Sequence, residues 1–420
     1  MKKFKNYFQA VQYIDSIRNF PAKHGSANVR DRRCNIPRLA YLLKLLNNPH
    51  HHLKCIQVTG TGGKGTVANY LHEILTAGGF KVGSFLSPHV SAEIERIKIN
   101  GQYIAPDQFS ETLDQLKPYL NICVEKSPYG HPSFFETLLA MAFLYFKKEK
   151  VDYAVLEAGL GGQNDATNIV KENKLALITN IDYDHTEVLG NSLTKIALDK
   201  AGIIKKGSCF ITTETRPKML KIFQERCQKV KASFLQIKAD ELERNQALAR
   251  AAAQHFKIAE KQIIKGFKNS KLPCRFEIIQ KSPLVIVDGS HNRIKLKYLE
   301  DKLENLNFRK LHIILALAYE KDARAALKEI LPLADKLWLT RTLLTYRKSS
   351  DLKELYQIGK KFKKNLEIKI IADPWQSLKL ALREVKKHDC LLITGSFYLA
   401  GELRKHWISE EYTLKHRKSF

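Results

Sequence analysis

One segment of the sequence has the residue types needed to hold a phosphate chain. It reads Thr-Gly-Thr-Gly-Gly-Lys-Gly-Thr at 59–66 and joins the apolar run 54–59 to a helical pattern. Glycines let backbone N–H groups close around phosphate oxygens, and a helix start adds a favourable dipole. Lys64 could neutralise phosphate charge, and Thr66 could reach Mg²⁺. Because Gly65 separates these two residues, the spacing departs from GxxxxGK[ST]. We interpret the segment as a variant phosphate loop; the alternative is a glycine-rich turn without a ligand.

Two further segments place acids, a histidine and a lysine near the ends of apolar runs. Glu157 opens Glu-Ala-Gly-Leu-Gly-Gly, which Asp-Ala-Thr-Asn follows at 165–168. A glutamate at a strand end beside glycines can reach a metal next to the phosphates, although such acids also cap helices. His185 ends an acid-rich loop at 180–185, where a metal site and a structural histidine are equally good interpretations. Lys200 begins Lys-Ala-Gly-Ile-Ile-Lys on a predicted helix and would otherwise be read as surface charge.

A fourth segment, Asp-Gly-Ser-His-Asn at 288–292, follows the apolar run 283–288. Ligands of open α/β sheets bind at the carboxyl ends of strands, which makes Asp288 and His291 candidate site residues. Taken alone, the segment favours an ordinary strand-to-helix turn in which Asp or Asn caps the helix.

The apolar runs before these segments predict two α/β regions. Short apolar strands that alternate with helices are typical of a parallel sheet with helices on both faces. Gly266, Pro273 and Pro283 cluster between the regions, and we place the domain boundary there, giving domains 1–274 and 275–420. The predicted strands are 54–59, 80–86, 153–156, 175–179 and 209–212 in the first region, and 283–288, 311–317, 336–340, 367–372 and 390–394 in the second.

Composition narrows the class of protein. The 420 residues are 44% apolar, which is enough to form packed cores and excludes disorder as the main state. No apolar run approaches the ~20 residues of a membrane helix, and none follows the basic start, so we expect a cytoplasmic protein without a membrane partner. Seven scattered cysteines without CxxC spacing predict reduced thiols.

The net charge of +27 has three possible explanations: a polyanion partner, small anionic substrates, or a lysine-rich composition along the whole chain. Residues 1–54 contribute to this excess, since they carry eleven Lys or Arg against Asp15 and Asp31. Composition alone leaves nucleic-acid binding open.

Taken together, the segments resemble the folylpolyglutamate synthase/dihydrofolate synthase family, a branch of the Mur ligase superfamily. The family pattern TGTNGKGS is similar to residues 59–66, EVGLGGRLDATN to 157–168, and KAGI(I/F)K to 200–205. The similarities keep the family's order from about residue 55 to 400, which is more specific than any single motif. Further family motifs resemble residues 87–90, 95–101, 133–136, 184–190, 245–249, 272–277, 288–292 and 395–398.

The resemblance implies a fold and an activity. The fold would be a P-loop-type Mur ligase ATPase domain over 1–274 and a Rossmann-like, doubly wound glutamate ligase domain over 275–420. The activity would be ATP-dependent addition of L-glutamate to dihydropteroate, to (tetrahydro)folate polyglutamates, or to both, through an acyl phosphate. ATP and Mg²⁺ at two sites, with K⁺ as a further candidate, would be the cofactors. The resemblance also implies a monomer with no nucleic-acid partner.

The resemblance also implies residue roles. Nucleotide contacts would come from Thr61, Gly63, Lys64, Gly65, Thr66, Asn245, Arg275 and Asp288. The Mg²⁺ sites would use Thr66, Ser87, Glu157, His185 and Lys200, the last as a carbamate. Acceptor contacts would come from Ser87, His89, Phe135 and Glu136. The residues closest to the chemistry would be Lys64, His185, Lys200, Asp288 and His291.

Four residues depart from the family pattern without removing an expected metal ligand or Lys64. Gly62 stands in place of Asn, Gln163 in place of Arg, Cys274 in place of Gly, and Arg293 in place of Pro. We therefore expect an active ligase whose acceptor preference these changes could alter.

Three alternatives stay open. A paralogous Mur-type ligase could use a different carboxylate acceptor. A basic nucleic-acid-binding NTPase would account for the charge, but no aromatic and basic interleaved strand is visible. A binding protein that has lost catalysis is disfavoured by the presence of Lys64, Glu157, His185 and Lys200.

Overall fold

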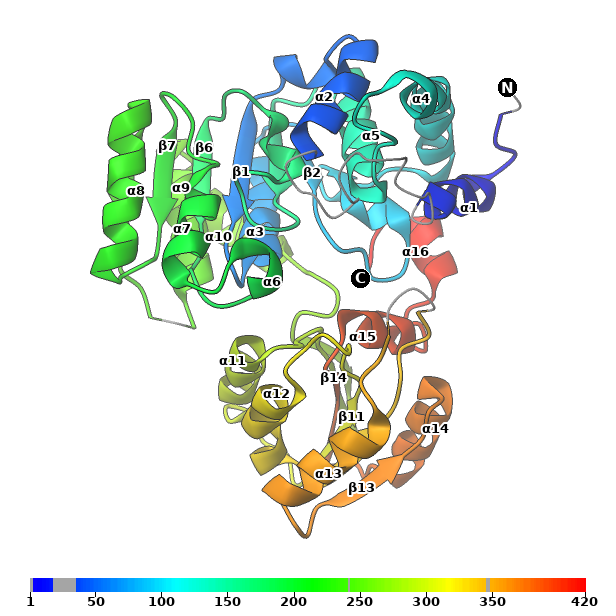
Figure 1. Cartoon of the computed structure of the whole chain (residues 1–420). Helices are drawn as coiled ribbons and strands as arrows, with labels where there is room; N and C mark the ends of the chain where they lie inside the picture. The colour runs from blue at the N-terminus through cyan, green and yellow to red at the C-terminus, as the bar shows by residue number, and fades with distance from the viewer. Residues whose placement is uncertain (1–2, 18–34, 241, 345–347) are drawn as a thin grey trace. The chain divides into compact units, whose positions relative to one another are not determined.

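The computed structural model describes residues 3–17, 35–240, 242–344 and 348–420, which form two compact units (Figure 1). The first unit comprises Met1–His89 and Glu93–Lys271, and the second comprises Val90–Ala92 and Leu272–Phe420. The predicted boundary between residues 274 and 275 stays a prediction. Within the described ranges, no helix combines the length and the apolar character needed to cross a membrane.

The first unit is built on a mixed sheet with strand order β4-β3-β2-β5-β1-β6-β7-β8. The neighbouring strands β2, β5, β1, β6, β7 and β8 pair in parallel. At one edge of the sheet, β3 pairs antiparallel with both β2 and β4. The central strands β1 and β6 are buried along their whole length, and β5 is buried after Tyr153, as expected for parallel strands covered on both faces. The strands are β1 (Cys55–Thr59), β2 (Val82–Phe85), β3 (Ile97–Ile99), β4 (Gln102–Tyr103), β5 (Tyr153–Glu157), β6 (Leu175–Ile178), β7 (Cys209–Thr212) and β8 (Ser233–Gln236).

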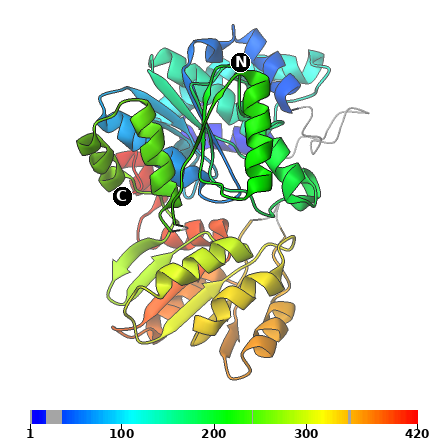
Figure 2. The ribbon, with the colours of Figure 1, turned by 90° about the vertical axis from the view of Figure 1, so that its left-hand side faces the viewer.

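Helices flank this sheet on both sides (Figure 2). α5, α7 and α8 cover the face that carries Gly83, Ala176 and Phe210, and α3 packs with α9 and α10 on the opposite face. The helices are α1 (Tyr7–Ser16), α2 (Asn35–Leu45), α3 (Lys64–Ala77), α4 (Pro106–Lys126), α5 (Phe134–Lys148), α6 (Thr186–Leu189), α7 (Leu193–Ala201), α8 (Pro217–Val230), α9 (Arg244–His255) and α10 (Glu260–Asn269), with short 3₁₀ turns η3 (Pro49–His52), η4 (Glu93–Arg96) and η5 (Ala166–Ile169).

The second unit has a sheet of order β13-β12-β11-β14-β10-β9, parallel except for β9. Alternate residues of its strands enter two separate cores: Ile313 and Leu337 face α11, α12 and α13, while Ile314 and Trp338 face α14 and α15. The elements are β9 (Glu277–Lys281), β10 (Leu284–Val287), α11 (Arg293–Leu303), β11 (Leu311–Leu315), α12 (Ala323–Ile330), η6 (Leu331–Leu333), β12 (Lys336–Leu339), α13 (Leu352–Phe362), β13 (Glu367–Ile370), α14 (Pro374–Glu384), β14 (Cys390–Thr394), α15 (Phe397–Arg404) and α16 (Glu410–His416).

The predicted fold class, two α/β regions with largely parallel sheets, is confirmed. The antiparallel strand β9 was not predicted, because its residues Glu-Ile-Ile-Gln-Lys lack a long apolar run. Val90–Ala92 was also assigned to the first region by its place in the chain, yet these residues pack with the second unit.

We expect Gly266→Ala to destabilise the first unit. A Cβ at this position would lie 2.5 Å from the Cα of Ile74, because α10 packs directly on the backbone of α3. Overpacking of this kind costs about 1–3 kcal/mol, more than the ~1 kcal/mol gained in helix propensity. Urea unfolding would measure the loss, with Lys265→Ala, an exposed neighbour on the same helix, as the control. Equal midpoints for the two variants would contradict the prediction.

Candidate active site

The glycine-rich segment forms a tight loop between β1 and α3, and the segment after β6 holds it in place. Gly63 starts α3 with a left-handed φ of 77°. The amide of Thr61 donates to the Asn180 carbonyl at 3.0 Å, and the amide of Gly62 donates to Asn180 Oδ1 at 2.9 Å. The Thr61 hydroxyl accepts from the Asp182 amide at 2.9 Å. The loop is therefore shaped by hydrogen bonds before any ligand arrives.

Asn245, at the start of α9, lies directly against this loop. A Cβ on Gly63 would overlap the Asn245 amide oxygen, so only glycine permits the approach. The same oxygen is buried and has no hydrogen-bond partner among the described residues. A buried acceptor without a donor is costly, so a ligand donor at this position would be stabilising. The structure thus brings Asn245 and the phosphate loop together, as their predicted nucleotide roles require.

Two lysines converge on one backbone carbonyl beneath the loop. Lys64 Nζ donates to the Gly60 oxygen at 3.1 Å, and Lys200 Nζ donates to the same oxygen at 3.0 Å. Lys200 is 3% exposed and arrives from α7, which the backbone of Gly162 approaches closely. Two ammonium groups at one acceptor repel each other, so this position favours an anionic group.

Glu157 completes the edge at which β1, β2 and β5 end. Its side chain is 3% exposed, and Oε2 accepts from the Ser87 amide at 2.8 Å. A Cβ on Gly65 would lie 3.2 Å from Glu157 Oε1, so the carboxylate borders the phosphate loop. The carboxyl ends of parallel strands meet at one edge of a sheet, and this edge collects the predicted metal ligands Ser87 and Glu157 with the loop that carries Thr66.

His185 lies in the segment after β6, whose residues Asn180 and Asp182 bond to the phosphate loop. Its imidazole lies near two acids of the same segment. It has a left-handed φ of 52° and lies 3.6 Å from Glu187 and 3.9 Å from Asp184. Within the described ranges, no group of three or more His, Cys, Asp or Glu side chains could hold a metal ion. Only Glu157 and His185 in the predicted metal set belong to these residue types, so the role of His185 stays a prediction.

The predicted acceptor residues His89 and Phe135 are held by neighbouring side chains. His89 Nδ1 accepts from Arg96 Nε at 3.0 Å, and its Nε2 lies 3.6 Å from Glu93. Phe135 packs edge-on against Phe85 with 5.2 Å between ring centroids. Their contact with an acceptor stays a prediction.

Glu136 has a structural partner that the sequence did not suggest. Its carboxylate pairs with Arg38 through Nε and Nη2, both at 2.6 Å, and the two side chains are 1% and 4% exposed. It also accepts from the Ser133 amide at 2.9 Å, which caps the start of α5. This carboxylate therefore ties α2 to α5, and its predicted contact with an acceptor stays a prediction. Arg38 lies in no motif, so no local signal pointed to it.

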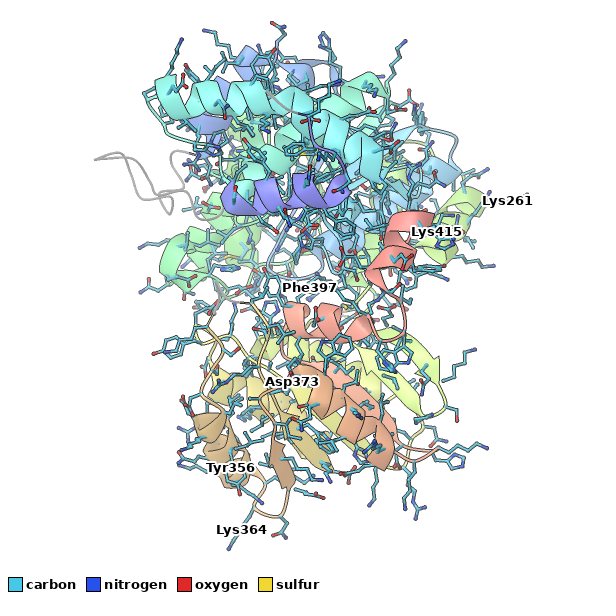
Figure 3. All side chains as sticks on the ribbon, turned by 90° about the vertical axis from the view of Figure 1, so that its right-hand side faces the viewer. Lys261, Tyr356, Lys364, Asp373, Phe397 and Lys415 are labelled. Carbon is cyan, nitrogen blue, oxygen red and sulfur yellow. The ribbon has the colours of Figure 1, made fainter. Side chains whose placement is uncertain are left out.

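The second unit presents its predicted residues around the turn before β9. Asp288 Oδ2 accepts from the Phe276 amide and Oδ1 from the Ser290 amide, both at 2.7 Å. The Arg275 guanidinium stacks on the ring of Phe397, 4.3 Å from its centroid. Phe397 lies at the start of α15 and is labelled in Figure 3. Asp288 therefore shapes two turns, and Arg275 rests on an aromatic face.

His291 lies in the loop after β10, where backbone and side-chain bonds orient it. Its Nδ1 lies 2.8 Å from the Gly289 carbonyl, and Lys295 Nζ donates to Nε2 at 3.1 Å. Nearby, burial lowers the pKa of Lys302, and the charge of Asp288 opposes that shift. In the first unit, burial and the charge of Arg226 lower the pKa of Lys205, which ends the Lys200 motif, to about 8.

Comparison with known proteins identifies the family. The model of the Mur ligase middle domain matches residues 58–279, and that of the Mur ligase, glutamate ligase domain matches residues 274–397. A dihydrofolate synthase/folylpolyglutamate synthase of Buchnera aphidicola is 30% identical over 89% of this chain and 94% of its own length. The chain belongs to the folylpolyglutamate synthase/dihydrofolate synthase family of Mur ligases. A Bacillus subtilis protein of the same name is 28% identical over 96% of this chain and 99% of its own.

Solved structures of this family share the fold. A folylpolyglutamate synthase from Thermotoga maritima superposes with a TM-score of 0.79 and 29% identity, covering 96% of both chains. A Mycobacterium tuberculosis folylpolyglutamate synthase complexed with ADP gives a TM-score of 0.85 at 24% identity, covering 96% of this chain and 98% of its own.

The four residues that depart from the family pattern differ in the space around them, in their exposure and in their backbone conformation. At Gly62 a Cβ would meet only Asn180 Oδ1, at 3.8 Å, so the usual asparagine would fit. Gln163 and Arg293 are exposed, and Arg293 lies 3.4 Å from Glu329. Cys274 is buried and adopts a φ of 55°, a conformation that favours glycine, the residue of the family pattern at this position.

We expect Gly63→Ala to weaken ADP binding by about tenfold or more, because the added methyl group overlaps Asn245 Oδ1 and the residue has a positive φ. Isothermal titration calorimetry would measure the dissociation constant. Gly130→Ala is a matched control, since Gly130 has a φ of 79° and no atom within 4 Å of the added Cβ. Unchanged ADP binding in Gly63→Ala would contradict the assignment of the loop.

Proposed function

We propose that this chain is an ATP-dependent ligase that joins L-glutamate to dihydropteroate, to folate polyglutamates, or to both. Family membership supports the reaction class. The observation that carries the proposal is the convergence of Lys64 and Lys200 on the Gly60 carbonyl, in a loop that the buried carboxylate of Glu157 borders at Gly65. A set of cations and an acid at the base of a glycine-rich loop suits transfer of a phosphoryl group.

The chemistry explains why such a site needs ATP. A carboxylate is a poor electrophile, so the acceptor carboxylate first takes the γ-phosphoryl group and becomes an acyl phosphate. The glutamate amine then attacks the acyl carbon, the new C–N bond forms, and phosphate leaves. Lys64 would stabilise the charge on the transferred group, together with loop amides other than those of Thr61 and Gly62, which donate to Asn180.

The residues at the sheet edge suit Mg²⁺, a hard cation that binds carboxylate and hydroxyl oxygens. Glu157, Thr66 and Ser87 would hold it next to the phosphates, where the ion would neutralise phosphoryl charge. His185 and a carbamate on Lys200 would serve a second ion. In carbamate formation the neutral amine of Lys200 attacks the carbon of CO₂ and releases one proton. This exchanges one of the two cations at Gly60 for an anion. K⁺ stays a prediction without assigned ligands.

The names of the relatives support a folate-type acceptor. The Bacillus subtilis and Buchnera aphidicola proteins are named for both activities, whereas a Lacticaseibacillus casei protein, 28% identical over 95% of this chain, is named folylpolyglutamate synthase alone. Dihydropteroate, folates, L-glutamate and ATP are anions, so a net charge of +27 suits these substrates without a nucleic-acid partner. We place the ligase in the cytoplasm as a monomer.

An acceptor panel tests the substrate class. With ATP, Mg²⁺ and L-glutamate present, we expect dihydropteroate, tetrahydrofolate or both to stimulate phosphate release and to gain the mass of one glutamyl group. Single-stranded DNA and RNA should give no stimulation, which separates this reading from a nucleic-acid-dependent NTPase. If neither folate-type acceptor supports turnover, the acceptor assignment is wrong.

Lys64→Ala should abolish ligation while leaving the thermal unfolding midpoint close to that of the parent, because its ammonium group acts on the phosphates. A loss of about 10²–10³-fold in kcat is the scale for one electrostatic contact. Near-normal turnover would refute the phosphate-loop assignment.

Lys200→Ala should lose most activity and recover part of it with added short-chain carboxylic acids, which can replace the carbamate. Intact-mass measurement in bicarbonate should find one added CO₂ on the parent protein that Lys200→Ala lacks. Lys206→Ala, which changes an exposed lysine in the same motif region, is the control. Full activity of Lys200→Ala without added acids would count against the metal role.

A further inference from the structure

A buried ion pair contacts the turn that carries Arg275. Arg404, on α15, has no exposed surface, and its guanidinium forms an ion pair with the carboxylate of Glu277, the first residue of β9. Its Nε donates to Oε2 at 2.8 Å and to Oε1 at 3.0 Å, and its Nη2 donates to Oε1 at 2.8 Å. Removal of either partner would leave an uncompensated charge in the core of the second unit.

Glu277 also holds the backbone of the turn. Its Oε2 accepts from the Cys274 amide at 2.8 Å, in addition to its bonds with Arg404. The Cys274 carbonyl accepts from the Gly289 amide at 2.9 Å, and the Phe276 amide donates to Asp288 at 2.7 Å. Both residues that flank Arg275 are thus tied to the segment directly after β10, and Cys274 is also tied to the start of β9.

The turn needs this support because two of its residues have unfavourable backbone conformations. Cys274 has a φ of 55° and Phe276 a φ of 50°, which lie in the left-handed region that side chains disfavour. Such conformations persist only where surrounding contacts impose them, and they occur often at functional sites. Arg275 lies between these two residues, so their conformation sets the direction of its side chain.

α15 supports Arg275 at two points. Phe397, at the start of the helix, is labelled in Figure 3. The guanidinium of Arg275 lies over its ring, 4.3 Å from the centroid. Arg404, at the end of the same helix, fixes the turn through Glu277. The last residues of the chain cover this pair, since Arg404 also donates to the Ser419 carbonyl and lies 5.3 Å from the ring of Phe420.

We propose that Arg404 and Glu277 are positioning residues that hold Arg275 in its nucleotide-binding conformation. The proposal rests on the assignment of Arg275 to the nucleotide in the function proposed above. The pair acts through the turn, because Arg404 bonds to Glu277, and Glu277 accepts from the amide of Cys274, the residue before Arg275. An ion pair with a purely structural role would stabilise the unit without affecting nucleotide affinity.

The second unit offers such a structural pair as a matched control. Lys336, on β12, is mostly buried and pairs with Glu384 and Glu367. These residues lie in strands and helices remote in the topology from β9. Lys336→Met should lower the unfolding midpoint and leave the ADP dissociation constant unchanged.

The test compares Arg404→Lys and Glu277→Gln with Arg275→Ala. Arg404→Lys keeps the positive charge but loses the bidentate hydrogen bonding to Glu277. Glu277→Gln keeps the side-chain volume but loses the ion pair. Calorimetry should give an ADP dissociation constant raised about ten- to a hundredfold in each, as expected for a displaced contact group. The KM for ATP should rise more than kcat falls. Phe420→Ala, which removes only the ring beside Arg404, should give a smaller change of the same sign if the other variants do not fold.

A double-mutant cycle decides between positioning and general stability. In the Arg275→Ala background, Glu277→Gln and Arg404→Lys should add little further loss of ADP affinity, because the group they position is gone. Fully additive losses, or unchanged ADP affinity in folded Glu277→Gln, would overturn the proposal. If Arg275→Ala alone leaves ADP affinity unchanged, this proposal fails with the nucleotide role of Arg275. The acceptor panel would still test the ligase function independently.

Discussion

The carbonyl oxygen of Gly60 is the point on which the first unit's site depends. It accepts from Lys64, four residues along the chain, and from Lys200, which is 140 residues away. A Cβ on Gly60 would overlap the Thr179 hydroxyl, so the close approach of β1 and β6 needs a glycine there. Two ammonium groups at one buried acceptor repel each other, so an anionic group next to them is favourable. Phosphate oxygens and a lysine carbamate both meet that need, which links the electrostatics of the loop to the chemistry proposed for it.

The two units solve the problem of precise positioning in different ways. In the first unit, parallel strands end at one edge, so the topology brings Ser87, Glu157 and the phosphate loop together. In the second unit, a short turn with unfavourable backbone angles is held by the side chains of Asp288 and Glu277. A sheet edge tolerates local changes better than such a turn, since the backbone angles of the turn oppose its conformation and a few specific bonds maintain it.

Sequence reasoning predicted the features that local patterns encode. Apolar runs located most of the strands, and the glycines beside Lys64 located the glycine-rich loop between β1 and α3, because both signals lie within a few adjacent residues. The short or polar strands β3, β4, β8 and β9 were missed. The pairs Arg38–Glu136 and Arg404–Glu277 were missed because their members lie 98 and 127 residues apart in the sequence. A lone arginine on an amphipathic helix looks the same whether its side chain faces solvent or a buried carboxylate, so the chain gives no local sign of its partner.

The turn at Cys274 shows how the distant pair of Glu277 and Arg404 can stabilise a departure from a local motif. A glycine at this position would adopt a φ of 55° without steric cost, whereas a side chain costs of order 1–2 kcal/mol. The cysteine gains from burial among the apolar residues under α15, which offsets part of that cost. The remaining cost of the backbone conformation is offset by hydrogen bonds within the turn, above all the one that the Cys274 amide donates to Glu277. In this chain the turn therefore relies more on the Glu277–Arg404 pair than it would with glycine, because its own backbone preference opposes the conformation that Arg275 requires.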